Sequence, residues 1–339
     1  MATSARLARR WLVSRSSPLR LLGTRTPRHP SARRACRSLQ AWACSSAHLR
    51  VLVTNDDGVD SALLVPLLDA LDVALPPGVA VRAVVPAEER SWFGKSMTRF
   101  AHVVVGSAVR GTHTVTTLSG TPADCAAWGV EHAFAAEGEG VMPDLVVSGT
   151  NLGMNAGAAF MISSGTVGAA LEGAIAGVKS IAVSLSLGKE ARVALKETGR
   201  VPCDLAASEY AAAIAARALE PGAWPEGVDV LNVNLPQNVG RGAAWEVTRV
   251  ARSRYTKVFS PVEGAAEGTF QHAPESLEWL DDSDGTDYAA LRRGGVSVTP
   301  LRLEGMFLST EGSDPLALRA ATEPLVRAAF GESDALVGS

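Results

Sequence analysis

Two adjacent carboxylates, Asp56 and Asp57, come directly after the run LRVLVTN, whose apolar residues are typical of a buried strand. Adjacent side chains of a regular strand face opposite sides of its sheet, so both acids can face one site only from a turn. Gly58 provides the backbone freedom for that turn. Because neighbouring carboxylates raise each other's pKa unless a cation lies between them, the pair indicates a cation site. The alternative is an ordinary Asx-type turn whose acids are solvated.

Polar side chains also follow two other predicted strands at the point where each ends. Ser91 lies in the polar loop after VAVRAVVP, and Asn151 ends the run PDLVVSGTN. The carboxyl ends of parallel strands meet at one edge of a sheet, where the ligand crevice of an open α/β sheet lies. Carboxylate, hydroxyl and amide oxygens are the ligands that Mg²⁺ and Mn²⁺ prefer. We therefore predict one divalent ion, Mg²⁺ or Mn²⁺, held by Asp56, Asp57, Ser91 and Asn151.

A candidate anion site lies at the start of the predicted helix GTVGAALEGAIAGV. Ser164, Gly165 and Thr166 stand at its N-terminus, where free N–H groups and the helix dipole both favour a phosphate. The alternative is a simple Ser/Thr N-cap, which is the most frequent role of such residues. Beside a candidate cation site we favour phosphate binding.

Apolar strand-like runs alternate with helical runs from about residue 48 onward. Strands without polar alternation that are separated by helices indicate a mostly parallel sheet covered on both faces. The fold class that we predict is a three-layer α/β/α, Rossmann-like domain. The predicted strands are 49–55, 79–86, 102–105, 112–118, 143–151, 180–186 and 229–236, and the predicted helices are 62–75, 122–136 with Thr121 as N-cap, 165–178 and 205–219.

The rhythm changes after about residue 240. The run WEVTRVARSRY at 245–255 predicts an edge or extension strand, and a long acidic, glycine-rich stretch follows it. GVSVTPL at 295–301 predicts a late strand, and 314–330 predicts a closing helix. We divide the chain into a leader at 1–47, a catalytic core at 48–240 and a C-terminal arm region at 241–339. Such arms frequently make subunit contacts.

The N-terminus has a composition of its own. Residues 1–55 contain no Asp or Glu but eleven arginines and many serines, which is typical of an organelle transit peptide without stable structure. A disordered basic tail that binds an acidic partner is the alternative. Arginines close to Met1 on an amphipathic run favour the mitochondrion over the chloroplast, and without a transit peptide the protein would be cytoplasmic.

The overall composition excludes some classes of protein. The formal net charge is −3, so we expect no stable complex with nucleic acid, which requires clustered Lys and Arg. No apolar run reaches the length of about 18 residues that a membrane-spanning helix needs, so we expect no membrane contact.

Six segments together resemble the SurE family of metal-dependent 5′/3′-nucleotidases and phosphatases, over about residues 50–302. They are VTNDDGVDS, VVPAEERS, SGTPADC, PDLVVSGTNLGMNAG, SSGTVGAALEG and DGTDYAALRRGGVSVTPL. The resemblance implies metal-dependent hydrolysis of phosphate monoesters, chiefly nucleoside monophosphates, with acid phosphatase or exopolyphosphatase activity as further options. It also implies homodimers or homotetramers built partly by exchanged C-terminal arms.

The resemblance also assigns residues. It places the metal ligands on Asp56, Asp57, Ser91 and Asn151, and further active-site polar residues on Asn155, Ser164, Gly165 and Thr166. As a mechanism we hypothesise that a water attacks the phosphorus in line, that Asp56 or Asp57 accepts its proton, and that Asn155, Ser164 and Thr166 steady the phosphoryl oxygens.

The chain departs from the family pattern in the loop after Ser91. A small residue usually follows this serine, but here Trp92 and Phe93 do, and they either alter access to the site and stack on a base or anchor the loop. Lys95 either touches phosphate or is solvated. A catalytically silent oligomeric α/β protein that binds nucleotides or phosphate remains the alternative function, although the intact set of oxygen ligands favours the enzyme.

Overall fold

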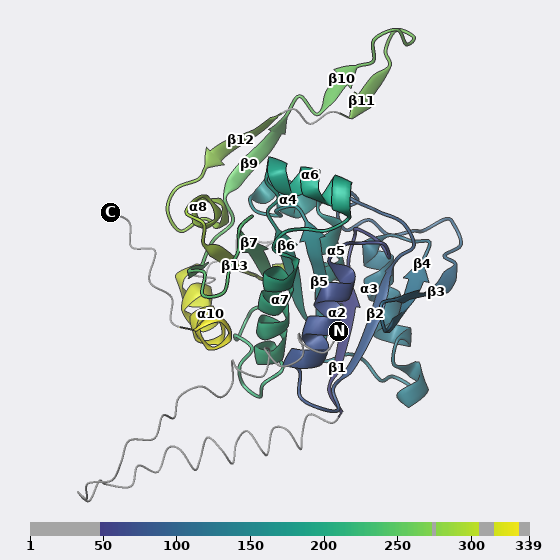
Figure 1. Cartoon of the computed structure of the whole chain (residues 1–339), viewed down its shortest axis with the longest axis vertical. Helices are drawn as coiled ribbons and strands as arrows, with labels where there is room; N and C mark the ends of the chain where they lie inside the picture. Colours follow the sequence, from purple (N-terminus) through teal and green to yellow (C-terminus); the bar gives the residue numbers. More distant parts are fainter. Residues whose placement is uncertain (1–47, 273–275, 305–314, 332–339) are drawn as a thin grey trace, which may run out of the picture. The chain divides into compact units, whose positions relative to one another are not determined.

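The central sheet has nine strands. The structure, a computed structural model, describes residues 48–272, 276–304 and 315–331 (Figure 1). In chain order the strands of this sheet are β1 (Arg50–Thr54), β2 (Ala80–Pro86), β3 (Val105–Arg110), β4 (His113–Leu118), β5 (Leu145–Leu152), β6 (Lys179–Leu185), β7 (Val230–Leu235), β8 (Trp245–Val247) and β13 (Val296–Leu301). Their order across the sheet is β3-β4-β2-β1-β5-β6-β7-β13-β8.

Most neighbouring strands run parallel, as the apolar runs predict. Val53 of β1 pairs in register with Ala83 of β2 on one side and with Val147 of β5 on the other. Two antiparallel pairs are exceptions, one between β3 and β4 and one between β7 and β13. The prediction of a mostly parallel sheet is therefore confirmed, and the crevice edge lies where β1, β2 and β5 end.

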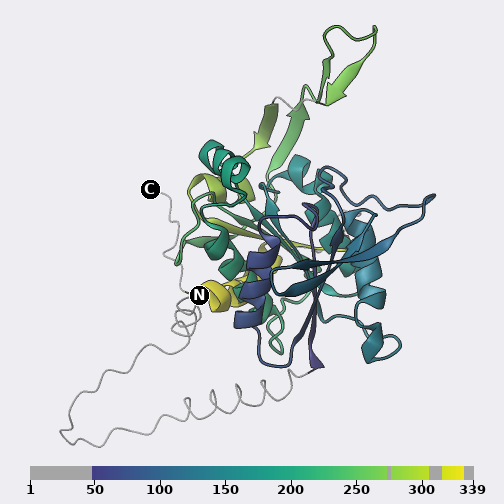
Figure 2. The same ribbon diagram turned by 45° about the vertical axis from the view of Figure 1, so that its right-hand side comes forward.

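Helices cover both faces of the sheet (Figure 1). They are α2 (Leu64–Ala74), α3 (Pro122–His132), α4 (Ala158–Ser163), α5 (Gly165–Ile175), α6 (Lys189–Thr198), α7 (Asp204–Ala218), α8 (Asp287–Arg292) and α10 (Pro315–Phe330), with a 3₁₀ turn at Ala135–Glu137. On one face the largest hydrophobic cluster joins α2, α7 and α10 to the sheet, and on the other α3 and α5 pack against smaller clusters. The three-layer α/β/α architecture is confirmed, and Figure 2 shows the same layers from a second direction.

The start of α3 agrees with the sequence in detail. Thr121 accepts a hydrogen bond from the backbone N–H of Asp124, whose carboxylate accepts one from the N–H of Thr121, and Pro122 takes the first helical position. The helix ends at His132, earlier than predicted. Two helices, α4 and α6, were not predicted, because one is a single short segment and the other is mostly polar.

The arm region is more regular than its sequence suggests. The predicted strand at 245–255 is wrong as one element, because it divides into β8 and β9 (Arg252–Thr256). The acidic stretch, for which the sequence indicates an extended arm or hairpin region, holds β10 (Phe259–Pro261), β11 (Phe270–His272) and β12 (Ser276–Asp281). These strands form two antiparallel ladders, β9 with β12 and β10 with β11, outside the main sheet. They carry few apolar residues, so hydrophobic periodicity could not reveal them.

The leader predicted at 1–47 lies outside the described residues, and the division at residue 240 stays a prediction. Within the described part of the chain, no helix has both the length and the apolar character needed to cross a membrane.

Candidate active site

The turn after β1 buries its acids. Asn55 closes the turn, since its Oδ1 accepts from the N–H of Gly58 (3.1 Å) and its Nδ2 donates to the carbonyl of Gly58 (3.0 Å). Gly58 has a φ of 83°, and a Cβ there would lie 2.8 Å from the carbonyl carbon of Glu88. The turn is thus of the Asx type, but Asp56 is only 3% exposed and Asp57 is partly buried. Asp56 therefore does not fit the solvated acids of the alternative interpretation.

Asp56 lies against the N-terminus of α5. The hydroxyl of Thr166 donates to Asp56 Oδ1, and the backbone N–H of Thr166 also bonds to this carboxylate. The approach is close, because a Cβ on Gly165 would lie 2.8 Å from the Cβ of Asp56. The anion nearest to the first turn of α5 is therefore Asp56 itself, and the helix dipole stabilises its charge.

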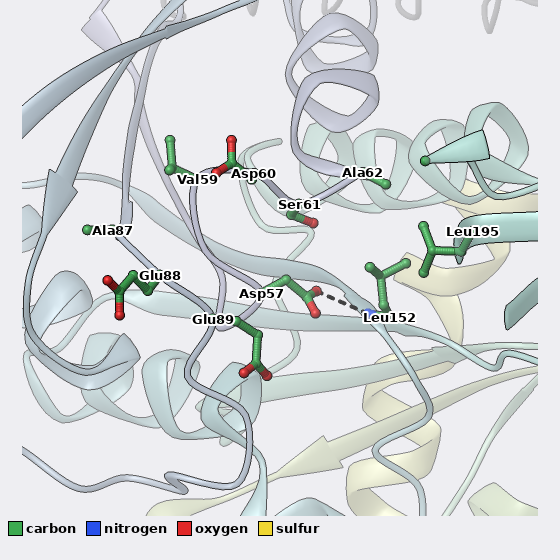
Figure 3. Close-up of a pocket in the computed structure, with 11 residues that line it drawn as sticks. Asp57, Val59, Asp60, Ser61, Ala62, Ala87, Glu88, Glu89, Leu152 and Leu195 are labelled. Atoms are coloured by element: carbon green, nitrogen blue, oxygen red, sulfur yellow. Dashed lines mark hydrogen bonds between the residues drawn. The ribbon is translucent and has the colours of Figure 1, made fainter. Parts of the chain in front are cut away.

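Asp57 reaches the end of β5 instead. Its Oδ2 accepts a hydrogen bond of 3.1 Å from the backbone N–H of Leu152, as Figure 3 shows. The neighbouring Asn151 donates from Nδ2 to the carbonyl of Gly153 (2.7 Å), which leaves its Oδ1 to act as a ligand. Two of the predicted strand ends are thereby joined through Asp57.

The loop after β2 joins the same turn. The backbone N–H of Arg90 donates to the carbonyl of Asp56 (2.7 Å), and this contact positions the next residue, Ser91. Ser91 is partly buried, and its backbone N–H donates to the carboxylate of Glu89 (2.9 Å). The structure therefore brings the backbone segments of all four predicted metal ligands together.

The charges of this site lack a counter-cation. Burial is the largest cause that raises the pKa of Asp56, and the bonds from Thr166 oppose it. Burial and then the charge of Asp56 raise the pKa of Asp57 well above its usual value, and Glu89 adds to the effect. In the described part of the chain neither Asp56 nor Asp57 forms an ion pair. A buried and a partly buried carboxylate next to a third, with no basic side chain paired to either in the described part of the chain, are the electrostatic pattern of a cation site.

The donor set fits a hard divalent ion. Two carboxylates, a hydroxyl and an amide carbonyl supply only oxygen ligands, which suits Mg²⁺ or Mn²⁺. No cluster of three or more His, Cys, Asp or Glu side chains suited to a metal occurs in the described ranges. The described residues therefore give no support for a soft-metal or zinc centre. The proposed set contains only two carboxylates, and its other two ligands, Ser91 and Asn151, are neutral, so the absence of such a cluster does not contradict it.

The residues predicted to bind phosphate at the start of α5, Ser164, Gly165 and Thr166, also make contacts within the protein. Ser164 is the N-cap of α5, since its Oγ accepts from the N–H of Val167 (3.1 Å), so the capping alternative applies to this residue. Its own O–H is still available to donate to a ligand. The hydroxyl of Thr166 is committed to Asp56. The hydroxyl of Thr166 therefore orients a carboxylate, which the sequence did not reveal.

Asn155 belongs to a polar network that the sequence did not lead us to expect. Its N–H donates to Asn234 Oδ1 (2.7 Å), its carbonyl accepts from Asn232 (3.0 Å), and its Nδ2 donates to Ser184 Oγ (2.8 Å). The signal was present in the run LNVNLP, where two asparagines alternate with apolar residues in a buried strand. The second N–H of the Asn155 amide is free to donate to a phosphoryl oxygen.

Lys95 pairs with Glu172, which lies nearly two turns beyond Thr166 along α5. This ion pair fits neither of the two options given above for Lys95. The ammonium group is not freely solvated, and it does not point at the first turn of the helix, where phosphate would bind. Lys95 thereby fastens the loop after Ser91 to the side of α5.

A cavity of about 500 Å³ opens beside Asp57. Its lining residues include Asp57, Asp60, Glu88, Glu89 and Leu152, and Figure 3 shows them around the turn after β1. The carboxylates on this wall would repel a phosphate unless a cation offsets them. The cavity therefore suits the approach of a cation and water better than the approach of a free anion.

Known proteins resemble this chain over most of its length. The family model "Survival protein SurE" matches residues 51–257. The 5′-nucleotidase SurE of Archaeoglobus fulgidus is 37% identical over 257 residues, which cover 76% of this chain and 92% of that protein. The 5′-nucleotidase SurE 1 of Thermus thermophilus is 38% identical over 262 residues, with the same two coverages. The crystal structure of the SurE protein from Aquifex aeolicus matches 75% of this chain with a TM-score of 0.56 at 29% identity.

Proposed function

The chain belongs to the SurE family, and we propose that it is a phosphoric monoester hydrolase that acts on nucleoside monophosphates with a divalent ion at Asp56 and Asp57. The relatives that match it are named 5′-nucleotidases, which supports a nucleotidase or phosphatase activity. The observation that supports the cation is a buried carboxylate, Asp56, beside a partly buried one, Asp57, neither of which pairs with a basic side chain in the described part of the chain.

The four oxygen donors, Asp56, Asp57, Ser91 and Asn151, would hold Mg²⁺ or Mn²⁺. A bound divalent ion supplies Lewis-acid polarisation of a phosphoryl oxygen and lowers the pKa of water. The side chains of the protein would supply the other two functions, which are to accept the proton of the attacking water and to bind the phosphoryl oxygens.

Asp56 and Asp57 take different parts in this proposal. Thr166 fixes the carboxylate of Asp56 through two bonds, so Asp56 serves as an oriented ligand. Asp57 is bonded on one oxygen only and lines the cavity through which water reaches the site. Asp57 is therefore the better placed of the two to accept the proton of the attacking water.

Two neutral donors complete the proposed phosphate site. The free N–H of the Asn155 amide and the O–H of Ser164 donate to phosphoryl oxygens that gain charge in the transition state. The backbone of Gly165 allows the close approach of Asp56 to the helix, which keeps cation and phosphate site adjacent. Both donors are held by protein contacts in advance, so little reorganisation is needed during the reaction.

The proposal is tested by hydrolysis of adenosine 5′-monophosphate and of its 3′ isomer by the full chain, in Mn²⁺, Mg²⁺ or EDTA. We expect activity that EDTA removes and that Mn²⁺ or Mg²⁺ restores. Asp57→Asn should lower kcat by at least about 10²-fold, which is the scale for loss of a charge-stabilising group. Asp69→Asn is the control, because Asp69 is an exposed carboxylate on α2 that does not line the cavity and is hydrogen-bonded to His113. Full activity in EDTA, or in the Asp57 variant, would refute the proposal.

Assembly and location are also proposed. The ladders of the arm expose Phe259 and Phe270, which supports a role in joining copies into a homodimer or homotetramer. The acid-free, arginine-rich composition of residues 1–55 supports import into an organelle, with the mitochondrion favoured. Light scattering of the full chain and imaging of a C-terminal fluorescent fusion test these two points.

A further inference from the structure

Trp92 has an unusual backbone conformation. Its φ is 68°, in the left-handed region that side chains other than glycine rarely adopt. Among the described residues other than glycine, only Lys257 also has a positive φ. Such strain persists where the surroundings enforce it, and it is concentrated at ligand and active sites. The position of Trp92, directly after the proposed ligand Ser91, therefore points to a functional reason for the conformation.

The indole of Trp92 joins an aromatic cluster, which we define as Trp92, Phe160, Tyr255 and His272. The ring centroid of Trp92 lies 4.8 Å from Tyr255 and 4.6 Å from His272, and Tyr255 lies 5.5 Å from Phe160. The members come from the loop after β2, from α4 and from strands β9 and β11 of the arm. Despite these contacts, 42% of Trp92 is exposed. The cluster thus leaves aromatic surface open to a ligand.

The aromatic cluster lies next to the proposed phosphate site. The hydroxyl of Tyr255 is 2.7 Å from Ser163 Oγ, and Ser163 directly precedes the N-cap of α5, Ser164. The loop that carries Trp92 is fixed to the same point, because the N–H of Gly94 donates to the carbonyl of Ser163 (2.9 Å). One end of this surface therefore borders the phosphate donors, and the other end is aromatic.

We propose that Trp92 is a specificity-determining residue that stacks on the nucleobase of the substrate. This inference rests on the proposed function and deepens it, because it names the group that the site recognises besides phosphate. A nucleoside monophosphate has a charged phosphate and a flat aromatic base separated by one ribose. This order matches the protein surface, which has the phosphate donor Ser164 at one end and the exposed indole of Trp92 at the other. An exposed indole binds any base through its face, so the preference is for a base over none rather than for one particular base.

The test compares two substrates that share a phosphate and a ribose but differ in the base. The measured quantity is kcat/KM for adenosine 5′-monophosphate divided by kcat/KM for ribose 5-phosphate. Trp92→Ala should lower this ratio by about 5- to 100-fold, the range found when an aromatic residue that stacks on a base is replaced by alanine. Trp92→Phe, which retains a ring, should keep the ratio within a few-fold of the wild type.

Two further variants separate stacking from anchoring of the loop. Trp92→Leu keeps apolar bulk without a ring, so it should lower the ratio as alanine does. A wild-type ratio in this variant would overturn the proposal and assign Trp92 a structural role. Phe93→Ala is the matched control, because Phe93 is 43% exposed in the same loop but its ring lies under the guanidinium of Arg90 instead of in the aromatic cluster. Its ratio should stay unchanged, and a fall equal to that of Trp92→Ala would overturn the proposal too.

Binding of adenosine gives a readout that needs no hydrolysis. Calorimetric titration of the full chain with adenosine should show binding that is weakened about 5- to 100-fold in Trp92→Ala. If the wild type binds adenosine in this way but cleaves no phosphate ester, the proposed function fails while the role of Trp92 stands. If phosphate esters are cleaved but adenosine binds the wild type and Trp92→Ala equally, the role of Trp92 is refuted while the function stands.

Discussion

Thr166 donates its hydroxyl hydrogen to Asp56 across a separation of 110 residues in the chain. The contact joins the end of β1 to the first turn of α5, and it sets the orientation of a carboxylate that we propose as a metal ligand. Because this carboxylate also lies at the positive end of the helix dipole, the site has its geometry before any ligand binds.

Thr166→Val tests whether the hydroxyl of Thr166 orients the carboxylate of Asp56. Valine keeps the shape of threonine but removes the O–H, so Asp56 loses a charge-assisted hydrogen bond of about 1.5–3 kcal/mol. We expect kcat to fall by about 10²-fold, since a small misplacement of a reacting group has an effect of this size. Thr166→Ser keeps the hydroxyl and serves as control. Equal activity in the valine and serine variants would show that the contact does not orient Asp56.

Removal of the metal should lower thermal stability. A cation that binds only the folded chain stabilises it by about 2.7 kcal/mol at a concentration of 100 times Kd. Differential scanning fluorimetry should therefore show a higher Tm in Mn²⁺ than in EDTA. Asp57→Asn should abolish this difference, and its Tm in EDTA should equal or exceed that of the wild type, because the amide relieves repulsion from Asp56. A wild-type response to Mn²⁺ in this variant contradicts the assignment.

Gly165→Ala should disturb the site through packing alone. The new Cβ would meet Asp56 Cβ at 2.8 Å and Pro122 Cγ at 2.9 Å, so the turn after β1 must move. We expect weaker binding of Mn²⁺ and kcat/KM lowered by about 10-fold or more. Gly240→Ala is the matched control, because its Cβ would meet no atom within 4 Å and its φ is not in the left-handed region. If both variants bind Mn²⁺ and turn over substrate like the wild type, the close packing of Gly165 on Asp56 is not required for activity.

Asp287→Ala should loosen the loop that carries Asn155. Asp287 is fully buried and accepts from the N–H of Gly157 (2.8 Å) and of Ala251 (2.9 Å). Its loss leaves buried N–H groups unpaired at about 1–3 kcal/mol each, so urea unfolding should show a large loss of stability. Asp284→Ala is the control, because Asp284 is exposed on the same turn. An unchanged midpoint in urea for Asp287→Ala would show that water satisfies these groups.

The sequence was informative where a polar residue interrupts an apolar pattern. Asp56, Asp57 and Asn151 stand at strand ends, and the carboxyl ends of parallel strands share one edge of the sheet, so their position in the chain alone predicts that they meet. The capping box of Thr121 is equally local, since its two partners lie three residues apart.

Other features depend on contacts between distant residues. Thr166 looks like a phosphate donor until its partner Asp56 is seen, because the sequence does not specify the packing of α5 on the turn. The network around Asn155 requires the register of β6 and β7. The strands of the arm form two-stranded ladders with exposed faces, so no hydrophobic period marks them.

The position of β13 has a consequence for biosynthesis. This strand lies between β7 and β8, although it is made about fifty residues after β8 and about sixty after β7. While the ribosome is still adding the arm, β8 has no partner and β7 presents an open edge to other chains. The last part of the sheet can therefore close only after Leu301 has left the exit tunnel. A chain truncated before Val296 should consequently aggregate, with an intact set of proposed ligands but an unfinished sheet.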